Sequence, residues 1–421
     1  MGLAGEIKQY ARMYFYIFWM LLAASLGFVK FIILAHILSV VDYGLYVAIF
    51  GISTFAGMVG SFGLLERTVK YYPRQWIEGR QMEMLVSARE IFYRLLHRFI
   101  LVGIIATAIT YIDNVPFTSG EVIMVCLLGL GSVLLSLLAS LYRAVGSRRA
   151  LQNFSLLRGC AAFVFAVSGS TYGFIGAISG EILASIVTGV CAFLVLRKQY
   201  AAAHKGLVSE DVSTAKNKIE KGHGSLYFAN IFTALTSMGD RVFIGHFLGA
   251  SAAGSYGFVM LIPQISQMMI NIVAQYIGPL VIKIVHSRHQ GRSHIGAIGL
   301  QAKIFSLLVV LFISGALWSR NLPSIDELFV KYSVSNFTLM FAGIMAIGQI
   351  YSLIQFHLIA HDGEHYVFAA SLVSGILFIL LFGIGVYQMR AIEYFVVVAT
   401  FARWLQVSIL TWALMRIKLN S

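Results

Sequence analysis

The hydrophobic positions of the chain form long unbroken runs, separated by shorter polar stretches. A bilayer core needs about 20 mostly apolar residues per helix, and about twelve runs are of that kind. They lack the alternation of transmembrane barrel strands and are far too long for them. We therefore predict an all-α integral membrane protein with about 12 transmembrane helices, at residues 14–38, 43–64, 95–112, 119–142, 151–171, 173–196, 225–248, 252–282, 303–319, 337–360, 366–387 and 393–414.

The composition supports this fold class. Hydrophobic residues make up 59% of the chain and charged residues 12%, whereas soluble domains carry about 25% charged residues. The three cysteines all lie inside apolar runs, at Cys126, Cys160 and Cys191. An odd number of such thiols indicates core packing rather than a disulfide framework.

The net charge of +13 could suggest a nucleic-acid partner, but the basic residues gather in alternate loops. This distribution is typical of the positive-inside rule, which places loops rich in Lys and Arg in the cytoplasm. We therefore expect both termini in the cytoplasm, the lipid bilayer as a partner, and no nucleic acid. Only Arg320, Lys331 and Arg390 fall in external loops on this assignment, and the longest external loop is about 320–336.

The chain divides into two halves of similar length. The polar stretch 197–224 has the character of a cytoplasmic linker between an N-terminal lobe, 1–196, and a C-terminal lobe, 225–421. Four positions recur 210 residues apart, which indicates two copies of one unit. Because each half would begin in the cytoplasm, the copies are expected to be related by a pseudo-twofold axis along the membrane normal, with a substrate site between them. The recurring pairs are His36 and His246, Leu38 and Leu248, Gly44 and Gly254, and Tyr46 and Tyr256.

Charged residues inside the predicted spans are the candidates for function, because charge in a bilayer is expensive. Lys30 and Arg241 lie about eight residues from the outer ends of their helices, roughly 12 Å at 1.5 Å per residue, and Arg403 about ten residues, roughly 15 Å. Long side chains can snorkel to the interface, which is credible for Lys30 and weak for Arg403. We interpret the three bases as a cationic cavity for an anionic substrate.

Asp240 has two interpretations that the sequence leaves open. Neighbouring helix positions point about 100° apart, so Asp240 does not simply neutralise Arg241. The carboxylate is either a counter-charge for a base on another helix or a site for a coupling ion, H+ or Na+. His36 and His246 sit near the outer ends of their helices and are expected to be polar residues of the outer rim.

Other motifs are discounted. The run 361–365 carries two histidines and two carboxylates, but the glycine at its centre favours a tight turn, so no metal site is expected. No Lys is followed by Ser or Thr, so there is no Walker A phosphate loop. We therefore expect no cofactor, and the energy for transport would come from an ion gradient, the membrane potential or a substrate gradient.

Several runs resemble those of the polysaccharide and O-antigen flippase family. Residues 33–38, 42–46 and 60–64 are similar to the opening of that family, and residues 240–244, 248–249 and 254–256 resemble its helix 7 to 8 signature. The family belongs to the multidrug, oligosaccharidyl-lipid and polysaccharide exporter superfamily. Family members often carry Arg where this chain has His36, which leaves open whether a cationic contact is kept at the rim.

The resemblance implies a flippase of the bacterial inner membrane that works by alternating access. Its substrate would be an undecaprenyl-diphosphate-linked oligosaccharide of O-antigen or a related surface polysaccharide, moved to the periplasmic leaflet. Other polysaccharide-assembly proteins are further implied partners. Buried Arg is the preferred partner of phosphate, so the charges of Lys30, Arg241 and Arg403 fit this substrate.

Two alternatives remain beside the flippase. A multidrug or other small-molecule exporter of the same superfamily would be expected to have more acids than bases in its cavity, because many drugs are cationic. Here the candidate residues inside the spans are three bases and one acid, Asp240. A polytopic polysaccharide polymerase would be expected to carry a large external loop with catalytic Arg or His, but this chain places its large loops inside. We therefore favour a transporter over an enzyme.

Overall fold

The computed structural model describes residues 3–61, 63–65, 68, 72, 75–76, 80–112, 118–144, 148–204, 224–286, 310, 314, 323–360, 363–388 and 391–420. Every element in these ranges is helical. Seven helical stretches among the described residues are long and apolar enough to cross a membrane, or eight if one bent helix pair is a single span. The prediction of an all-α, multi-pass membrane protein is confirmed. The span predicted at 303–319 lies outside the described residues except for positions 310 and 314, as does most of the linker.

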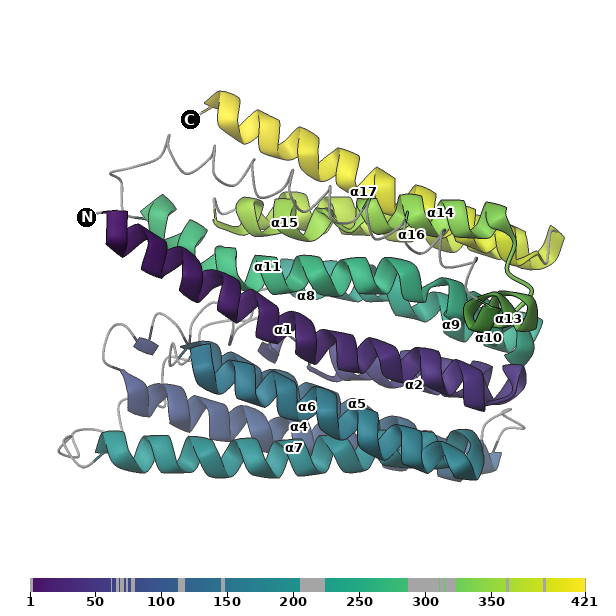
Figure 1. The fold of residues 1–421 in the computed structure, drawn as a ribbon, viewed down its shortest axis with the longest axis horizontal. Coiled ribbons are helices and arrows are strands. Elements are labelled where there is room, and N and C mark those ends of the chain that lie inside the picture. Colours follow the sequence, from purple (N-terminus) through teal and green to yellow (C-terminus); the bar gives the residue numbers. More distant parts are fainter. Residues whose placement is uncertain are drawn as a thin grey trace. The chain divides into compact units, whose positions relative to one another are not determined.

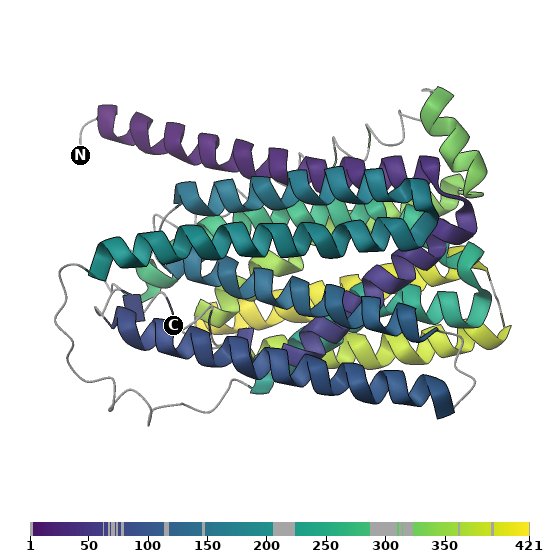
Figure 2. The ribbon, with the colours of Figure 1, turned by 90° about the horizontal axis from the view of Figure 1, so that it is seen from below.

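Unit 1, the first of two compact units, comprises residues Met1–Lys30 and Ile49–Tyr227. Within it, α6 packs along α7, α5 packs against α7, and α4 packs against α5. Figures 1 and 2 show these helices side by side. The helices of the unit are the first part of α1 (Leu3–Ile37), the second part of α2 (Val40–Ser61), α4 (Gln81–Ile112), α5 (Ser119–Ala144), α6 (Arg148–Gly169), the short turn η1 (Ser170–Tyr172) and α7 (Gly173–His204).

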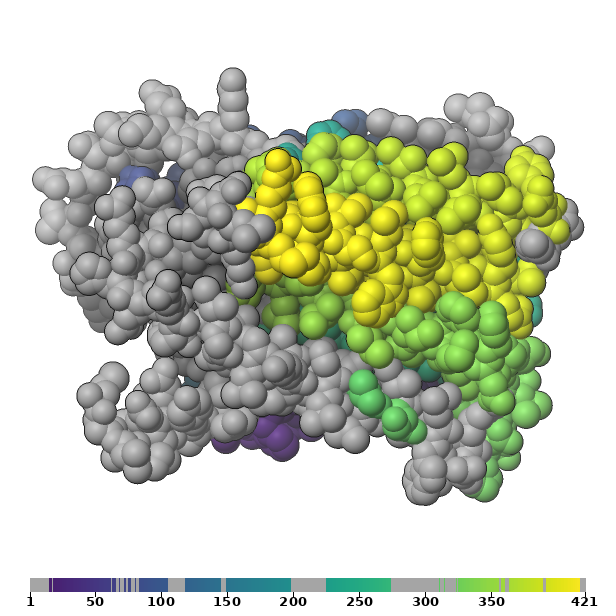
Figure 3. All heavy atoms as spheres, turned by 90° about the horizontal axis from the view of Figure 1, so that it is seen from above, coloured from purple at the N-terminus to yellow at the C-terminus, as the bar shows by residue number. Residues whose placement is uncertain are grey.

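Unit 2 comprises residues Phe31–Ala48 and Phe228–Ser421. It therefore includes the α1–α2 corner. Within it, α17 packs against α14, α15 and α16, and its side chains run along the face seen in Figure 3. The other helices are α8 (Gly224–Ala234) from Phe228 onward, the π-turn η3 (Leu235–Gly239), α9 (Asp240–Leu248), α10 (Ala250–Val259), α11 (Leu261–His286), α13 (Pro323–Lys331), α14 (Asn336–Gly348), α15 (Tyr351–Ala360), α16 (Glu364–Gln388) and α17 (Ile392–Asn420).

Three predicted spans contain a local departure from the regular α-helix. The span at 225–248 is interrupted by η3, where the hydroxyls of Thr236 and Ser237 both donate to the carbonyl of Thr233 and compete with the regular backbone pattern. The span at 252–282 bends by 47° between α10 and α11, where Pro263 cannot donate to the carbonyl one turn earlier. The span at 337–360 remains a single candidate membrane span, with a short turn between α14 and α15.

Two further features concern the segments between predicted spans. Residues 81–94, which precede the span predicted at 95–112, form the first turns of the continuous helix α4. The expected loop at 320–336 contains the helix α13, which begins at Pro323. Proline is favoured at the first position of a helix because its missing N–H would have no partner there.

The two copies of the repeat meet in a reciprocal contact within unit 2. A Cβ added at Gly44 would lie 1.8 Å from the carbonyl oxygen of Ala250, and one added at Gly254 would lie 2.4 Å from that of Val40. Positions 40 and 250 are themselves 210 residues apart, so each copy presents the same two positions to the other. This is the pattern that a local twofold relation produces, and the glycines let the two backbones approach closely.

The α1–α2 corner is held by the end of α13. The amine of Lys331 donates to the carbonyl oxygens of Ala35, His36 and Leu38 at 2.8, 3.0 and 2.7 Å. The hydroxyl of Tyr332 donates to the Ala35 oxygen at 2.8 Å. The last carbonyls of a helix lack intrahelical partners, and a cation there suits the helix dipole. Burial, and then the neighbouring Tyr43, raise the pKa of Tyr332, so its hydroxyl remains a donor.

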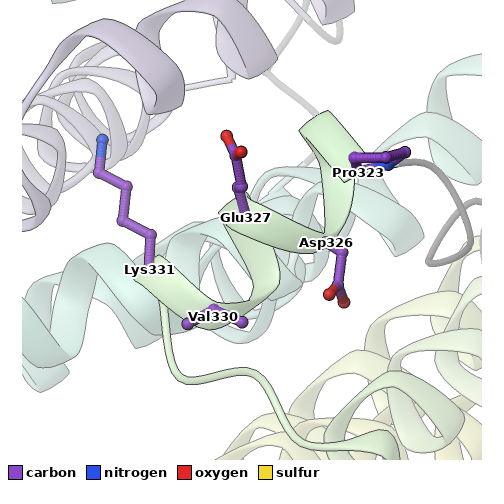
Figure 4. Close-up of a pocket in the computed structure, with 5 residues that line it drawn as sticks. All are labelled: Pro323, Asp326, Glu327, Val330 and Lys331. Atoms are coloured by element: carbon purple, nitrogen blue, oxygen red, sulfur yellow. The ribbon is translucent and has the colours of Figure 1, made fainter.

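The same helix lines an open pocket of about 470 Å³. Figure 4 shows Glu327 and Lys331 extending from one side of α13 and Asp326 from another. The pocket lies against a single short helix, and its lining combines two acids with one base. This lining does not favour a ligand of either charge. The amine of Lys331 is instead hydrogen-bonded to the α1–α2 corner.

The glycine contact can be tested with single methyl groups. We expect Gly44→Ala and Gly254→Ala each to destabilise the purified protein by about 1–3 kcal/mol, because a methyl group would overlap a backbone carbonyl. The control is Gly383→Ala in α16, where an added Cβ meets nothing within 4 Å. Thermal unfolding in detergent is the measurement. Equal melting temperatures for all three variants would contradict the close contact.

The corner can be tested through Lys331. We expect Lys331→Met to remove three charged hydrogen bonds and lower the stability by about 1.5–3 kcal/mol. Glu327→Gln, an exposed change on the same helix, is the matched control and should leave the melting temperature unchanged. If both variants melt like the parent protein, Lys331 does not stabilise the α1–α2 corner.

Candidate functional site

Asp240 lies in the interior of unit 2, directly after the π-turn. Its side chain is 1% exposed. One carboxylate oxygen accepts the backbone N–H of Arg241 at 2.8 Å, and the other accepts the hydroxyl of Tyr256 at 2.6 Å. π-turns inside helices are frequent at functional sites. Tyr256 belongs to the second copy of the repeat motif, so a residue of the motif is hydrogen-bonded directly to the buried acid.

Arg241 is as deeply buried as Asp240, at 1% exposure. Its Nε and Nη2 atoms are buried and have no hydrogen-bond partner among the residues that the structure describes. The guanidinium group acts electrostatically on Asp240, Tyr256 and Tyr43. A guanidinium group is always charged, so these donors present positive charge to whatever approaches them.

Arg403, on α17, is also buried. Its Nη1 donates to the side-chain oxygen of Gln406 at 2.7 Å, and its guanidinium carbon lies 4.3 Å from the ring centroid of Tyr351. Gly348 makes room for it, because a Cβ at that position would lie 3.0 Å from Cγ of the arginine. The Nε and Nη2 atoms of Arg403 are buried without a hydrogen-bond partner in the described part of the chain.

Gln406 is oriented by two hydroxyl groups. Its amide nitrogen donates to Ser371 at 3.1 Å and to Thr233 at 3.3 Å. This arrangement turns the Gln406 oxygen toward Arg403 and fixes one of the arginine's donors. The orientation of the guanidinium group therefore depends on three helices, α8, α16 and α17.

The structure brings three of the predicted residues together. Both Arg241 and Arg403 act electrostatically on Asp240, with Arg241 the stronger, so two cations lie within electrostatic range of one acid in unit 2. Formal charges leave one unit of positive charge in excess. Buried N–H groups without partners are costly, and an anion with several acceptor oxygens would satisfy them.

Lys30 belongs to unit 1 and has a different environment. It is buried and forms an ion pair with Glu181 on α7. Its amine also lies 5.6 Å from the ring centroid of Phe50. The positive charge of Lys30, predicted to contact the substrate, is therefore already neutralised by Glu181. A cavity shared by Lys30, Arg241 and Arg403 stays a prediction.

Glu181 and Arg158 are not among the predicted site residues, although both fall inside predicted spans. Arg158, on α6, acts electrostatically on Glu181. The rule that singled out Lys30, charge within an apolar run, applies equally to these two residues. A complete count of charges in the predicted spans would have found them.

The remaining predicted site residues lie at helix ends. His36 and His246 are both exposed, and they occupy the last turns of α1 and α9. The described residues contain no group of three His, Cys, Asp or Glu that could hold a metal ion. His361 and Asp362 of the discounted motif lie outside the described residues.

The Tyr256 hydrogen bond to Asp240 can be tested directly. We expect Tyr256→Phe to lower the stability by about 1.5–3 kcal/mol, because a buried carboxylate loses a partner. Tyr387→Phe, which removes an exposed hydroxyl from α16, is the control. The measurement is the thermal unfolding midpoint in detergent. A midpoint that falls equally for both would show that the effect is not specific to Asp240.

No protein-family description matches the sequence, and no curated protein matches it. Solved structures do match along nearly the whole chain. A mutant of the Vibrio cholerae MATE transporter VcmN is 14% identical, with 97% of each chain covered and a TM-score of 0.63. An outward-facing multidrug resistance MATE family transporter of the MOP superfamily is 13% identical, with 96% of this chain and 95% of that chain covered and a TM-score of 0.58.

A third structure is a MOP superfamily transporter from Pyrococcus furiosus, described as having a binding pocket of reverse polarity that suggests a different function. It is 13% identical, with 96% of this chain and 95% of that chain covered and a TM-score of 0.56. These likenesses show the fold: the chain has the fold of MOP superfamily transporters. They do not show membership of the polysaccharide flippase family.

Proposed function

We propose that the protein is a transporter of an anionic amphiphile, and that this substrate is an undecaprenyl-diphosphate-linked oligosaccharide. One observation carries the proposal: Arg241 and Arg403 are buried in unit 2, and each has two donor nitrogen atoms, Nε and Nη2, without a partner among the described residues. A guanidinium group presents donors in a planar fork that matches phosphate oxygens. A diphosphate supplies both the charge and the acceptors that these groups lack.

The fold supports transport as the class of function. Solved structures with this fold are transporters of the MOP superfamily, and two lobes that rearrange around a site provide alternating access. The sugar would occupy a polar cavity, while the lipid tail stays in the bilayer. The resemblance of residues 33–64 and 240–256 to the flippase family supplies the particular lipid carrier.

Small-molecule export is the second candidate, and the likenesses to solved structures favour it over the flippase. Several of those structures are multidrug transporters. A buried acid such as Asp240 is also the group that a cationic drug would require. Against this, the two arginines beside Asp240 exceed its charge, so a cation would meet net repulsion.

Further assignments go with the proposed flippase. The protein would lie in the bacterial inner membrane with both termini in the cytoplasm, and lobes 1–196 and 225–421 would flank the linker. Other polysaccharide-assembly proteins would be partners. Asp240 serves as the counter-charge of Arg241 and Arg403 or as the site of a coupling ion, H+ or Na+.

The test is flipping in reconstituted vesicles. A fluorescent short-chain polyprenyl-diphosphate disaccharide is placed in the vesicles, and a quencher added outside reports the fraction in the outer leaflet. Transport of a cationic dye is measured in parallel. We expect Arg241→Gln and Arg403→Gln each to slow flipping of the diphosphate lipid at least about tenfold, which corresponds to about 1.4 kcal/mol. Glutamine keeps a polar side chain but removes the charge.

The matched control is Arg416→Gln, which changes an exposed arginine on the same helix as Arg403. Its flipping rate should equal that of the parent protein. Transport of the dye without transport of the lipid would favour the small-molecule exporter. Normal lipid flipping by both arginine variants would contradict the role of these guanidinium groups.

A further inference from the structure

Glu181 holds two cations within unit 1. Its carboxylate pairs with Lys30 of α1, and Arg158 of α6 acts on it electrostatically. Lys30 and Glu181 are 3% and 5% exposed, whereas Arg158 is exposed. The three residues come from three different helices, so the cluster depends on the packing of α1, α6 and α7.

The cluster of Lys30, Arg158 and Glu181 has one positive charge in excess, as does the group of Arg241, Arg403 and Asp240 in unit 2. The two clusters differ in whether their cations are already paired. In unit 2, Arg241 and Arg403 retain donors without partners in the described residues. In unit 1, the amine of Lys30 is already occupied by an internal carboxylate. Lys30 cannot bind an incoming anion at full strength while that carboxylate stays in place.

We propose that Glu181 is an internal counter-ion that an incoming phosphate or diphosphate displaces from Lys30, so that Glu181 sets how strongly unit 1 binds anionic substrates. The inference rests on the proposed transport of an anionic lipid. The incoming anion is attracted by the excess positive charge of the cluster. The Glu181 carboxylate then yields Lys30 to the substrate and keeps Arg158 as its neighbour.

The chemistry favours such an exchange. A lone buried lysine is unstable, because removing the partner of a buried ion pair leaves an uncompensated charge. An internal carboxylate therefore keeps the empty site stable. A diphosphate carries more charge and more acceptor oxygens than a carboxylate, so it can replace Glu181 where a singly charged anion competes poorly. The internal acid would act as a filter for multiply charged head groups.

A purely structural ion pair makes the opposite prediction. If Glu181 only stabilises the packing of α1 and α7, removing its charge leaves Lys30 unpaired and weakens folding and binding together. If Glu181 competes with the substrate, removing its charge strengthens binding even where stability falls. Affinity and stability therefore have to be measured on the same variants.

The experiment is isothermal titration of the full-length protein in lipid nanodiscs, with farnesyl diphosphate as the probe. Farnesol, which has the same tail without the diphosphate, reports the contribution of the tail. We expect Glu181→Gln to bind farnesyl diphosphate at least about tenfold more tightly than the parent protein, with farnesol binding unchanged. Glu90→Gln, which breaks an exposed ion pair with Arg94 in the same unit, should change neither affinity.

A second variant links the gain to Lys30. Lys30→Met/Glu181→Gln should bind farnesyl diphosphate at least about tenfold more weakly than Glu181→Gln alone. Glu181→Asp keeps the charge on a shorter side chain and should show an intermediate gain, which covers the case in which the glutamine variant fails to fold. Equal or weaker binding by the Glu181 variants, or a gain that survives loss of Lys30, overturns the inference.

The two proposals fail in different ways. If the parent protein binds farnesyl diphosphate more tightly than farnesol but Glu181→Gln binds no more tightly, the counter-ion role is wrong and the anionic substrate stands. If neither the parent nor any Glu181 variant distinguishes the two probes, both proposals are wrong. Binding of the diphosphate by Glu181→Gln but not by the parent would show that the internal acid blocks the site and is not displaced, which overturns the inference.

Discussion

The need to compensate a charge buried among apolar helices is the constraint on which the interior of each unit depends. Unit 1 meets it internally, because Glu181 pairs with Lys30. Unit 2 meets it only in part: Tyr256 and a backbone N–H occupy Asp240, and Gln406 occupies one donor of Arg403. Buried donors without a partner among the described residues are costly, so a ligand that supplied acceptors would stabilise them. The buried charged residues in the described part of the chain thus lie in two clusters, which differ in how many of their hydrogen-bonding atoms are paired.

The sequence predicted which residues carry these charges better than it predicted their partners. Lys30, Asp240, Arg241 and Arg403 were found because charge in an apolar run is conspicuous, and all four are buried. Pairing could not be read in the same way, since Lys30 and Glu181 are 151 positions apart and meet only through helix packing. Arg403 is likewise held by Gln406, whose own partners lie far away in the sequence, on α8 and α16. An uncharged residue such as Gln406 leaves no comparable signal in an apolar span.

Helix number was easier to predict than helix continuity. Long apolar runs specify spans, but breaks depend on local competition for backbone groups. Pro263 and Pro323 were available as signals for the bend after α10 and for the start of α13. The π-turn had a weaker signal, because Thr and Ser side chains bond to the preceding turn in many unbroken helices. The offset of 210 residues identified Gly44 and Gly254 as equivalent positions, but equivalence alone does not require that the two copies touch.

Fold and substrate are separate questions for this chain. A shared fold hosts different functions, so likeness to multidrug transporters leaves the cargo open. The distribution of charge is the more specific guide, because a site discriminates by the partners it leaves unsatisfied as well as by those it offers. Two arginines around one acid in unit 2, and two cations around one acid in unit 1, both leave positive charge in excess. Under the proposed function, either cluster taken by itself would repel a cationic drug and attract a diphosphate.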